Sequence, residues 1–80
     1  MIDAEETKII FGRRLKAERA LKGIERKELT NFLQLNKAAI GMYETGKNFP
    51  SVEVLINIAN YLDVSIDYLL CRTEERTAHQ

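Results

Sequence analysis

Hydrophobic residues recur at helical spacing in five consecutive segments of the chain. The first predicted helix begins at about residue 4 or 7 and extends to Lys22, with Phe11 and Leu15 on its buried stripe. Acidic residues in its first turn and basic residues later suit the helix dipole, and Gly23 stands where a helix often ends. We therefore expect a long first helix that this glycine closes.

Two short amphipathic segments follow, separated by only a few residues. The segment 26–33 buries Leu29 and Leu33. The next runs from Asn36 as N-cap to about Glu44, and its inner face is formed by Ala39, Ile40 and Tyr43. Gly46 stops it. Two short helices with so brief a connection are typical of a helix-turn-helix.

Two further helices are predicted after a turn at residues 48–51. The fourth begins at Ser51 as N-cap and ends near Leu62, with a core stripe of Leu55, Ile58, Ala59 and Leu62. The fifth begins at Ser65 with Asp67 near its start, and its apolar residues close the bundle. No segment alternates as a strand would, so the sequence predicts an all-α fold, a compact five-helix bundle.

The length of 80 residues allows one small domain with limited stability to spare. We expect residues 1–9 to form an N-terminal extension with the start of the first helix, and residues 10–70 to form the domain. Residues 71–80 are expected to be a frayed tail, because Ala78 is the one apolar residue from Arg72 onward.

The charges are segregated along the chain although the net charge is zero. Residues 8–47 carry ten Lys or Arg and four Glu, a net charge of +6, and each flank carries −3. A polyanion-binding face needs such a local positive field, but solvated helix faces would give the same pattern.

Residues for other kinds of chemistry are scarce. Cys71 has no second cysteine for a disulfide and no zinc-ligand spacing around it, which favours a reducing cytoplasm and neither metal nor cofactor. The one histidine, His79, lies in the predicted tail and Cys71 has no base nearby in sequence, so an enzyme is not expected. The acidic N-terminus and the short apolar run 9–11 argue against export and against a membrane span.

In its order of motifs the chain resembles the phage repressor and Cro family of helix-turn-helix DNA-binding domains. The likeness covers about residues 10–70 and rests on the following pieces at family spacing: Phe11-Gly12-Arg13-Arg14-Leu15, Arg19, Gly23-Ile24, Glu28-Leu29, Ala39-Ile40, Tyr43-Glu44, Gly46-Lys47, Pro50-Ser51, Leu55, Ile58-Ala59 and Leu62-Asp63-Val64-Ser65. The resemblance implies a lambda-repressor-like bundle in which the second and third helices form the helix-turn-helix.

The resemblance further implies that the third helix lies in the major groove of double-stranded DNA. The residues then expected to meet bases are Asn36, Lys37, Ala38, Gly41 and Met42. Lys37 can donate to guanine O6 or N7, and Ala38 or Met42 can pack on a thymine methyl. A solvated surface or a protein-contact patch would be the alternative for this face.

Phosphate contacts are expected at the start of the second helix and around the end of the third, from Arg26, Lys27, Tyr43, Lys47 and Asn48. The chain departs from the family at four positions, and one of them is Arg26, which stands where the family usually has a glutamine. Glu25 would face a phosphate unfavourably, Gln34 replaces the usual turn glycine and would adopt a left-handed conformation, and the hydroxyl of a buried Thr30 would need a backbone partner.

Two further expectations come from the resemblance alone. Arg19 and Glu44 occupy positions that often form an ion pair in relatives. The chain is expected to act as a homodimer, because one short helix reads too few base pairs to select a site, with Ile66, Tyr68 and Leu70 in the dimer interface.

These features predict a sequence-specific DNA-binding transcriptional regulator, most simply a repressor that binds a two-fold operator. The alternative is a protein-interaction module, such as the antitoxin of a toxin pair or a regulator that binds a protein partner. That alternative is motivated by the bland outward residues Ala38, Gly41 and Met42.

Overall fold

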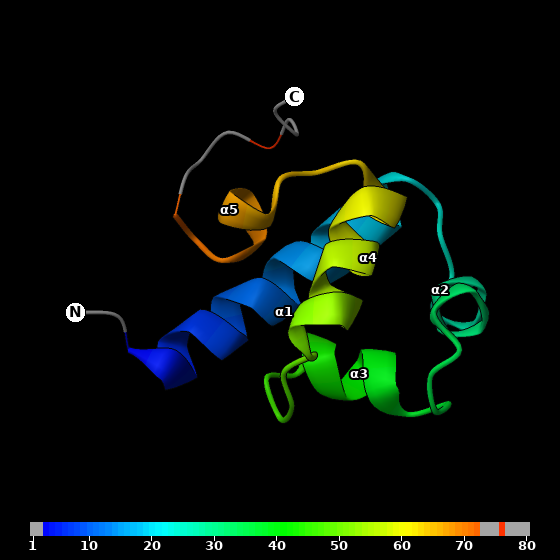
Figure 1. The fold of residues 1–80 in the computed structure, drawn as a ribbon, viewed down its shortest axis with the longest axis horizontal. Coiled ribbons are helices and arrows are strands. Elements are labelled where there is room, and N and C mark those ends of the chain that lie inside the picture. Colours follow the sequence, from blue (N-terminus) through cyan, green and yellow to red (C-terminus); the bar gives the residue numbers. More distant parts are fainter. Residues whose placement is uncertain (1–2, 73–75, 77–80) are drawn as a thin grey trace.

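Five helices and no strand make up the described part of the chain, as the hydrophobic pattern predicts (Figure 1). The structure is a computed structural model that describes residues 3–72 and 76. α1 (Ala4–Leu21) runs the length of the molecule, and α4 (Val52–Leu62) crosses in front of it. In Figure 1, α2 (Arg26–Leu33) lies at one side, α3 (Ala39–Glu44) lies below α4, and α5 (Ile66–Leu69) lies on the side opposite α2.

The helix ends follow the local signals in the sequence. The side chain of Asp3 caps α1 by accepting from the N–H groups of Glu5 and Glu6, and Gly23 follows the helix at φ +67°. Ser51 and Ser65 cap α4 and α5 in the same way, each accepting from the N–H three residues on.

The turn between α2 and α3 contains one expected feature and one correction. Gln34 has the left-handed conformation expected of it, at φ 55° and ψ 44°. Asn36 is not the N-cap of α3, which begins at Ala39 with Ala38 as its N-cap. The reason is a tight turn: Ala39 N–H donates to the carbonyl of Asn36 and Ala38 N–H donates to Asn36 Oδ1, at 3.0 and 2.8 Å.

The core is formed by the predicted stripes of the five helices. Leu33 and Ala39 are half-buried at its edge, although we expected them inside. The ring of Phe49, from the loop after α3, packs on Phe11 with 5.0 Å between ring centroids. The fully or nearly buried hydrophobic residues are Phe11, Leu15, Leu29, Ile40, Tyr43, Leu55, Ile58, Ala59, Leu62, Val64 and Leu69.

Gly12 brings α1 and α3 into close contact. A Cβ atom placed on Gly12 would lie 2.7 Å from the carbonyl oxygen of Glu44 and still closer to that of Tyr43. Since no side chain fits there, the glycine lets α1 approach the backbone at the end of α3. This contact fixes the position of α3 against the rest of the domain.

Arg76 lies in the segment that we expected to fray, and the structure corrects that expectation at this residue. Its Nε and Nη2 lie 2.7 and 2.8 Å from the carboxylate oxygens of Glu18, a buried residue of α1, and its carbonyl accepts from Ser65 N–H. Lys22 Nζ is a second partner of Glu18, at 2.9 Å. Burial of the Glu18 carboxylate is what makes these partners necessary. The other residues of the predicted tail after Arg72, His79 included, lie outside the described residues.

Candidate nucleic-acid interface

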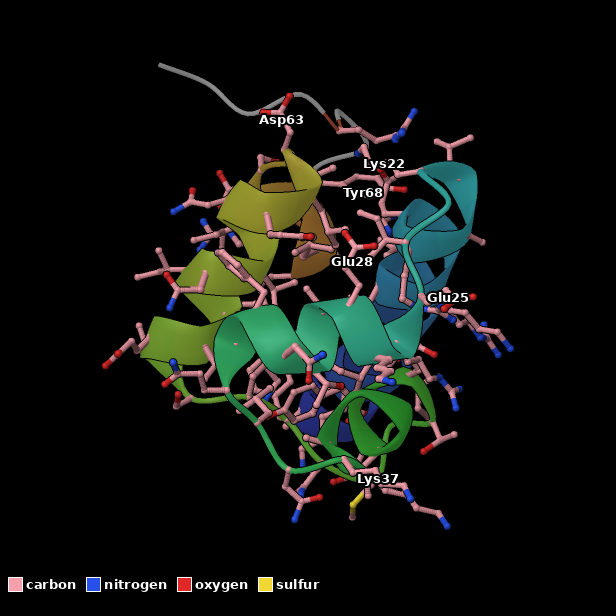
Figure 2. The ribbon with its side chains drawn as sticks, turned by 90° about the vertical axis from the view of Figure 1, so that its right-hand side faces the viewer. Lys22, Glu25, Glu28, Lys37, Asp63 and Tyr68 are labelled. Carbon is pink, nitrogen blue, oxygen red and sulfur yellow. The ribbon has the colours of Figure 1, made fainter. Side chains whose placement is uncertain are left out.

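The outward side of α3 and the turn before it form an exposed surface. Asn36, Lys37 and Ala38 are exposed, Met42 is exposed at the middle of α3, and Gly41 is half-buried. Figure 2 shows Lys37 beside α3 at the edge of the molecule, pointing away from the core. The five residues expected to meet bases therefore lie on one side of the turn and helix, and no core contact occupies the side chain of Lys37.

A hollow of about 540 Å³ lies between α2 and the turn that precedes α3. It is lined by Arg26, Lys27, Thr30, Asn31 and Lys37, three of which are cations and none of which is acidic. Lys27, Lys37 and Lys47 make no ion pair with any residue in the described part of the chain. Their charges are thus available to an anion.

Thr30 does not have the backbone partner that we expected for its hydroxyl. It is 9% exposed, no hydrogen bond joins its hydroxyl to a described residue, and no buried side-chain oxygen lacks a partner there. The oxygen must then reach solvent, and the hollow that Thr30 lines provides that solvent.

One acidic side chain of α2, that of Glu28, points away from this surface. Glu28 lies on the opposite side of α2 from Lys37 (Figure 2), where its carboxylate accepts a hydrogen bond from the hydroxyl of Tyr61 in α4. That hydrogen bond raises the pKa of Tyr61 above its ordinary value. Lys27 and Lys37 therefore line a hollow on one side of α2, and one of the few carboxylates of the +6 segment lies on the other side.

The start of α2 has no side-chain cap. Glu25 occupies the N-cap position, makes no capping hydrogen bond, and projects from the end of α2 (Figure 2). Its exposed carboxylate stands beside the free N–H groups of the first turn, where an anion would otherwise bind. Glu25 thus partly offsets the positive field of Lys27.

Glu44, at the end of α3, is the centre of a cluster of three charged side chains. The expected pair is present: Arg19 Nε lies 2.7 Å from Glu44 Oε2. Arg26 is a second partner, with Nε and Nη2 at 3.0 and 2.9 Å from Oε1. Arg19 also donates to the carbonyl of Ile24, so the cluster joins α1, α2 and α3.

The role of Arg26 in this cluster was not foreseen from the sequence. We expected its side chain to serve a phosphate, yet part of the guanidinium is bound to Glu44 across α3. A signal was present, because Arg26 stands where the family usually has a glutamine, and Glu44 was already expected to pair with a cation. The helical pattern alone does not show which side chains meet across α2 and α3.

Residues around the end of α3 differ in how freely they reach solvent. Lys47 and Asn48 are exposed, and both of their backbone N–H groups donate to the carbonyl of Met42, which leaves the side chains free. Tyr43 is buried, and burial raises the pKa of its hydroxyl above the ordinary value. That hydroxyl remains a hydrogen-bond donor at neutral pH and makes no hydrogen bond with a described residue.

The residues expected at the dimer interface are half-buried. Ile66, Tyr68 and Leu70 each pack against the core and keep part of their surface exposed. Tyr68 also holds α1 to α5, since Arg14 stacks on its ring with Cζ 4.2 Å from the centroid and donates to its carbonyl. These residues complete the bundle and leave a modest apolar surface.

Two short helices joined by a tight turn, the second wedged against α1 and a basic hollow lying between them, define a helix-turn-helix domain. The family model described as helix-turn-helix matches residues 15–69, which is more than half of the chain. The chain belongs to the Cro/C1-type helix-turn-helix family, a family of DNA-binding domains of transcriptional regulators and not of enzymes.

Curated relatives are transcriptional regulators by name. The chain is 39% identical over 61 residues to the SPbeta prophage-derived HTH-type transcriptional regulator YonR of Bacillus subtilis, covering 76% of this chain and 56% of YonR. It is 33% identical over 60 residues to the HTH-type regulator YazB of the same organism, covering 75% of this chain and 87% of YazB. The chain thus spans about half the length of YonR and most of YazB.

Solved structures show the same fold. The restriction-modification controller protein C.AhdI from Aeromonas hydrophila matches with a TM-score of 0.70 and 27% identity, over 78% of this chain and 94% of that one. The DNA-binding domain of BldD from S. venezulae matches with a TM-score of 0.68 and 25% identity, over 81% and 97%. The all-α, five-helix prediction is confirmed.

The described residues contain neither a helix suited to a membrane nor a cluster suited to a metal ion. No helix within residues 3–72 is both long enough and apolar enough to cross a membrane. No group of three or more His, Cys, Asp or Glu residues there is placed to hold a metal ion.

Proposed function

We propose that this chain is the DNA-binding unit of a transcriptional regulator that inserts α3 into the major groove of double-stranded DNA. The observation that carries the proposal is the basic hollow between α2 and α3, whose lining includes Lys27 and Lys37 with no carboxylate to neutralise them. Asn36, Lys37, Ala38, Gly41 and Met42 then face the bases, and of these Lys37 is the polar side chain that reaches furthest.

Phosphates on the two sides of the groove would be held by separate groups. Lys27 and the N–H groups at the start of α2 serve one strand, and Lys47 with Asn48 serves the other. Arg26 is next to Lys27 in the sequence and can assist it in binding a phosphate of that strand. The Tyr43 hydroxyl is a further donor. Lys27, Lys47 and Asn48 are exposed, so they can bind phosphate without any loss of folded structure.

We further propose that the unit acts as a repressor and binds as a homodimer on a two-fold site, with the two α3 helices about one helical turn, roughly 34 Å, apart. The half-buried side chains of Ile66, Tyr68 and Leu70 are the surface proposed for the dimer contact. Sedimentation of the free chain and of its DNA complex measures the stoichiometry, and two chains per duplex site are expected.

The test is a binding titration against randomised duplexes at several salt concentrations, with fluorescence anisotropy as the readout. The expected result is selection of one sequence and a steep fall in affinity with salt, because each phosphate contact releases counterions. Lys37→Gln should relax the base preference. Arg72→Gln removes the same charge shortly after α5, a helix that lies apart from α2 and α3 in Figure 1, and should leave the base preference unchanged.

Two results would contradict this function. Binding that is indifferent to both salt and sequence excludes a DNA reader. Capture of a defined protein partner by a chain that does not bind DNA would favour the protein-interaction module instead.

A further inference from the structure

Arg26 belongs to α2, yet its side chain lies across the outer side of α3. Its Nε and Nη2 are bound to Glu44 at the last residue of α3, at 3.0 and 2.9 Å. To reach that carboxylate from the first residue of α2, the side chain must cross the gap between the two helices. The guanidinium is therefore fixed on α3 although it comes from α2.

Gly41 is the position of α3 over which the guanidinium lies. A Cβ atom placed on Gly41 would be 3.4 Å from Arg26 Nη1 and 3.7 Å from Cζ. Gly41 itself has no side chain to offer a base, and the guanidinium occupies the adjoining space. At this place in the middle of α3, Arg26 stands in for the missing side chain.

The donors of Arg26 are not all used by Glu44. A guanidinium has five N–H donors, of which Nε and Nη2 face the carboxylate. Nη1 makes no hydrogen bond to any residue of the described part of the chain, and the side chain is 51% exposed beside the basic hollow. Since Arg19 already neutralises Glu44, the three-residue cluster keeps one positive charge.

We infer that Arg26 is a specificity-determining residue, held over Gly41 by Glu44 so that its free Nη1 side donates to a guanine in the major groove. The inference rests on the proposed function of α3. Guanine presents two acceptors, O6 and N7, to which an arginine donates. A fixed guanidinium suits this task because base readout depends on position, whereas a phosphate contact needs charge and tolerates movement.

Lysine cannot replace arginine here. Its ammonium group lacks the planar fork that reaches Glu44 with one edge and a base with another. Arg26→Lys therefore keeps the charge and removes the geometry. Lys27→Gln is the matched control next in the sequence, because Lys27 is exposed and makes no ion pair with a described residue.

The experiment selects sites from randomised 30-base-pair duplexes with the wild type and with Arg26→Lys, Arg26→Gln and Lys27→Gln. We expect the wild type to select a site with one guanine that becomes degenerate in both Arg26 variants. The preference for that guanine should fall by about 5- to 150-fold, the worth of a good bidentate contact. Lys27→Gln should select the same guanine and bind all sequences more weakly.

Gly41→Ala distinguishes base readout by Arg26 from base readout by the α3 backbone beneath it. The added Cβ would meet the guanidinium at an ordinary contact distance, so Arg26 stays in place and the guanine should still be selected. Loss of that guanine in Gly41→Ala with its retention in Arg26→Lys would assign the readout to close approach of the α3 backbone instead.

Other results would overturn the inference in distinct ways. An unchanged selected site in both Arg26 variants, with uniformly weaker binding, would make Arg26 a phosphate contact only. Failure of the wild type to select any site would reject the proposed function itself. Circular dichroism melting of each variant checks that the domain still folds.

Discussion

Arg19 Nε lies 2.7 Å from Glu44 Oε2, and this ion pair ties the long first helix to the last residue of α3. The Glu44 side chain is 1% exposed and that of Arg19 is 16% exposed, so the pair is almost wholly removed from water. A buried charge is tolerated only when it is paired and hydrogen-bonded. The position of the candidate reading helix therefore depends on this contact.

Glu44→Gln should destabilise the domain by about 3 to 5 kcal/mol, because it strands the buried charge of Arg19 and releases Arg26. Arg19→Met should cost less, since Arg26 still neutralises Glu44. Urea unfolding of the two variants measures the difference, with exposed Lys16→Gln as control. Equal losses in both variants would show that Arg26 does not share the carboxylate.

Gly12→Ala should destabilise the domain although alanine is the better helix former. Its methyl group would meet two backbone carbonyls of α3, which cannot move aside as a side chain can. We expect a loss of about 1 to 3 kcal/mol, the usual cost of overpacking, measured by thermal unfolding. Gly41→Ala is the control, because the same methyl group meets only the end of a flexible side chain there. A stabilised Gly12→Ala variant would contradict the close approach of α1 and α3.

Gln34→Gly should stabilise the domain by up to about 1 kcal/mol. The left-handed conformation costs a residue with a Cβ about 1 to 2 kcal/mol, and glycine avoids this cost. The greater conformational freedom of glycine in the unfolded chain reduces the resulting stabilisation. Asp63 has nearly the same conformation, at φ 56°, but aspartate tolerates it better. Chemical denaturation should therefore show a smaller gain, or none, for Asp63→Gly.

The Arg76 guanidinium holds the pKa of Glu18 below its ordinary value of 4.5, against the opposing effect of burial and with help from Lys22. Because the pKa is lower in the folded state, the stabilisation is present above pH 4.5 and is lost as the pH falls toward the native pKa. The free energy of unfolding of the Glu18→Gln variant should lack this part of the dependence on pH. Unfolding free energies from pH 7 to pH 3 test it, and parallel curves for wild type and variant would contradict it.

Local signals in the sequence were sufficient for most of the secondary structure. The bounds of α2 are those predicted, Ser51 and Ser65 cap the helices expected of them, and Gly23 follows α1. These features depend on neighbouring residues along the chain, and such short-range effects can be read from one sequence. The start of α3 was misplaced because Asn36 satisfies both a cap and a turn, two motifs with the same residue preferences.

The tertiary structure decided which side chains contact one another between helices. Whether Arg26 serves a phosphate or Glu44 depends on how α2 crosses α3, and the helical periodicity of each does not contain that angle. The same holds for Arg76. Its segment is polar and therefore predicts fraying, and only the structure shows that the buried carboxylate of Glu18 binds Arg76. The sequence by itself determined the helices, their inner faces and the family. Only the packed structure decided which charges are bound and which remain free, because burial depends on all neighbours in space at once.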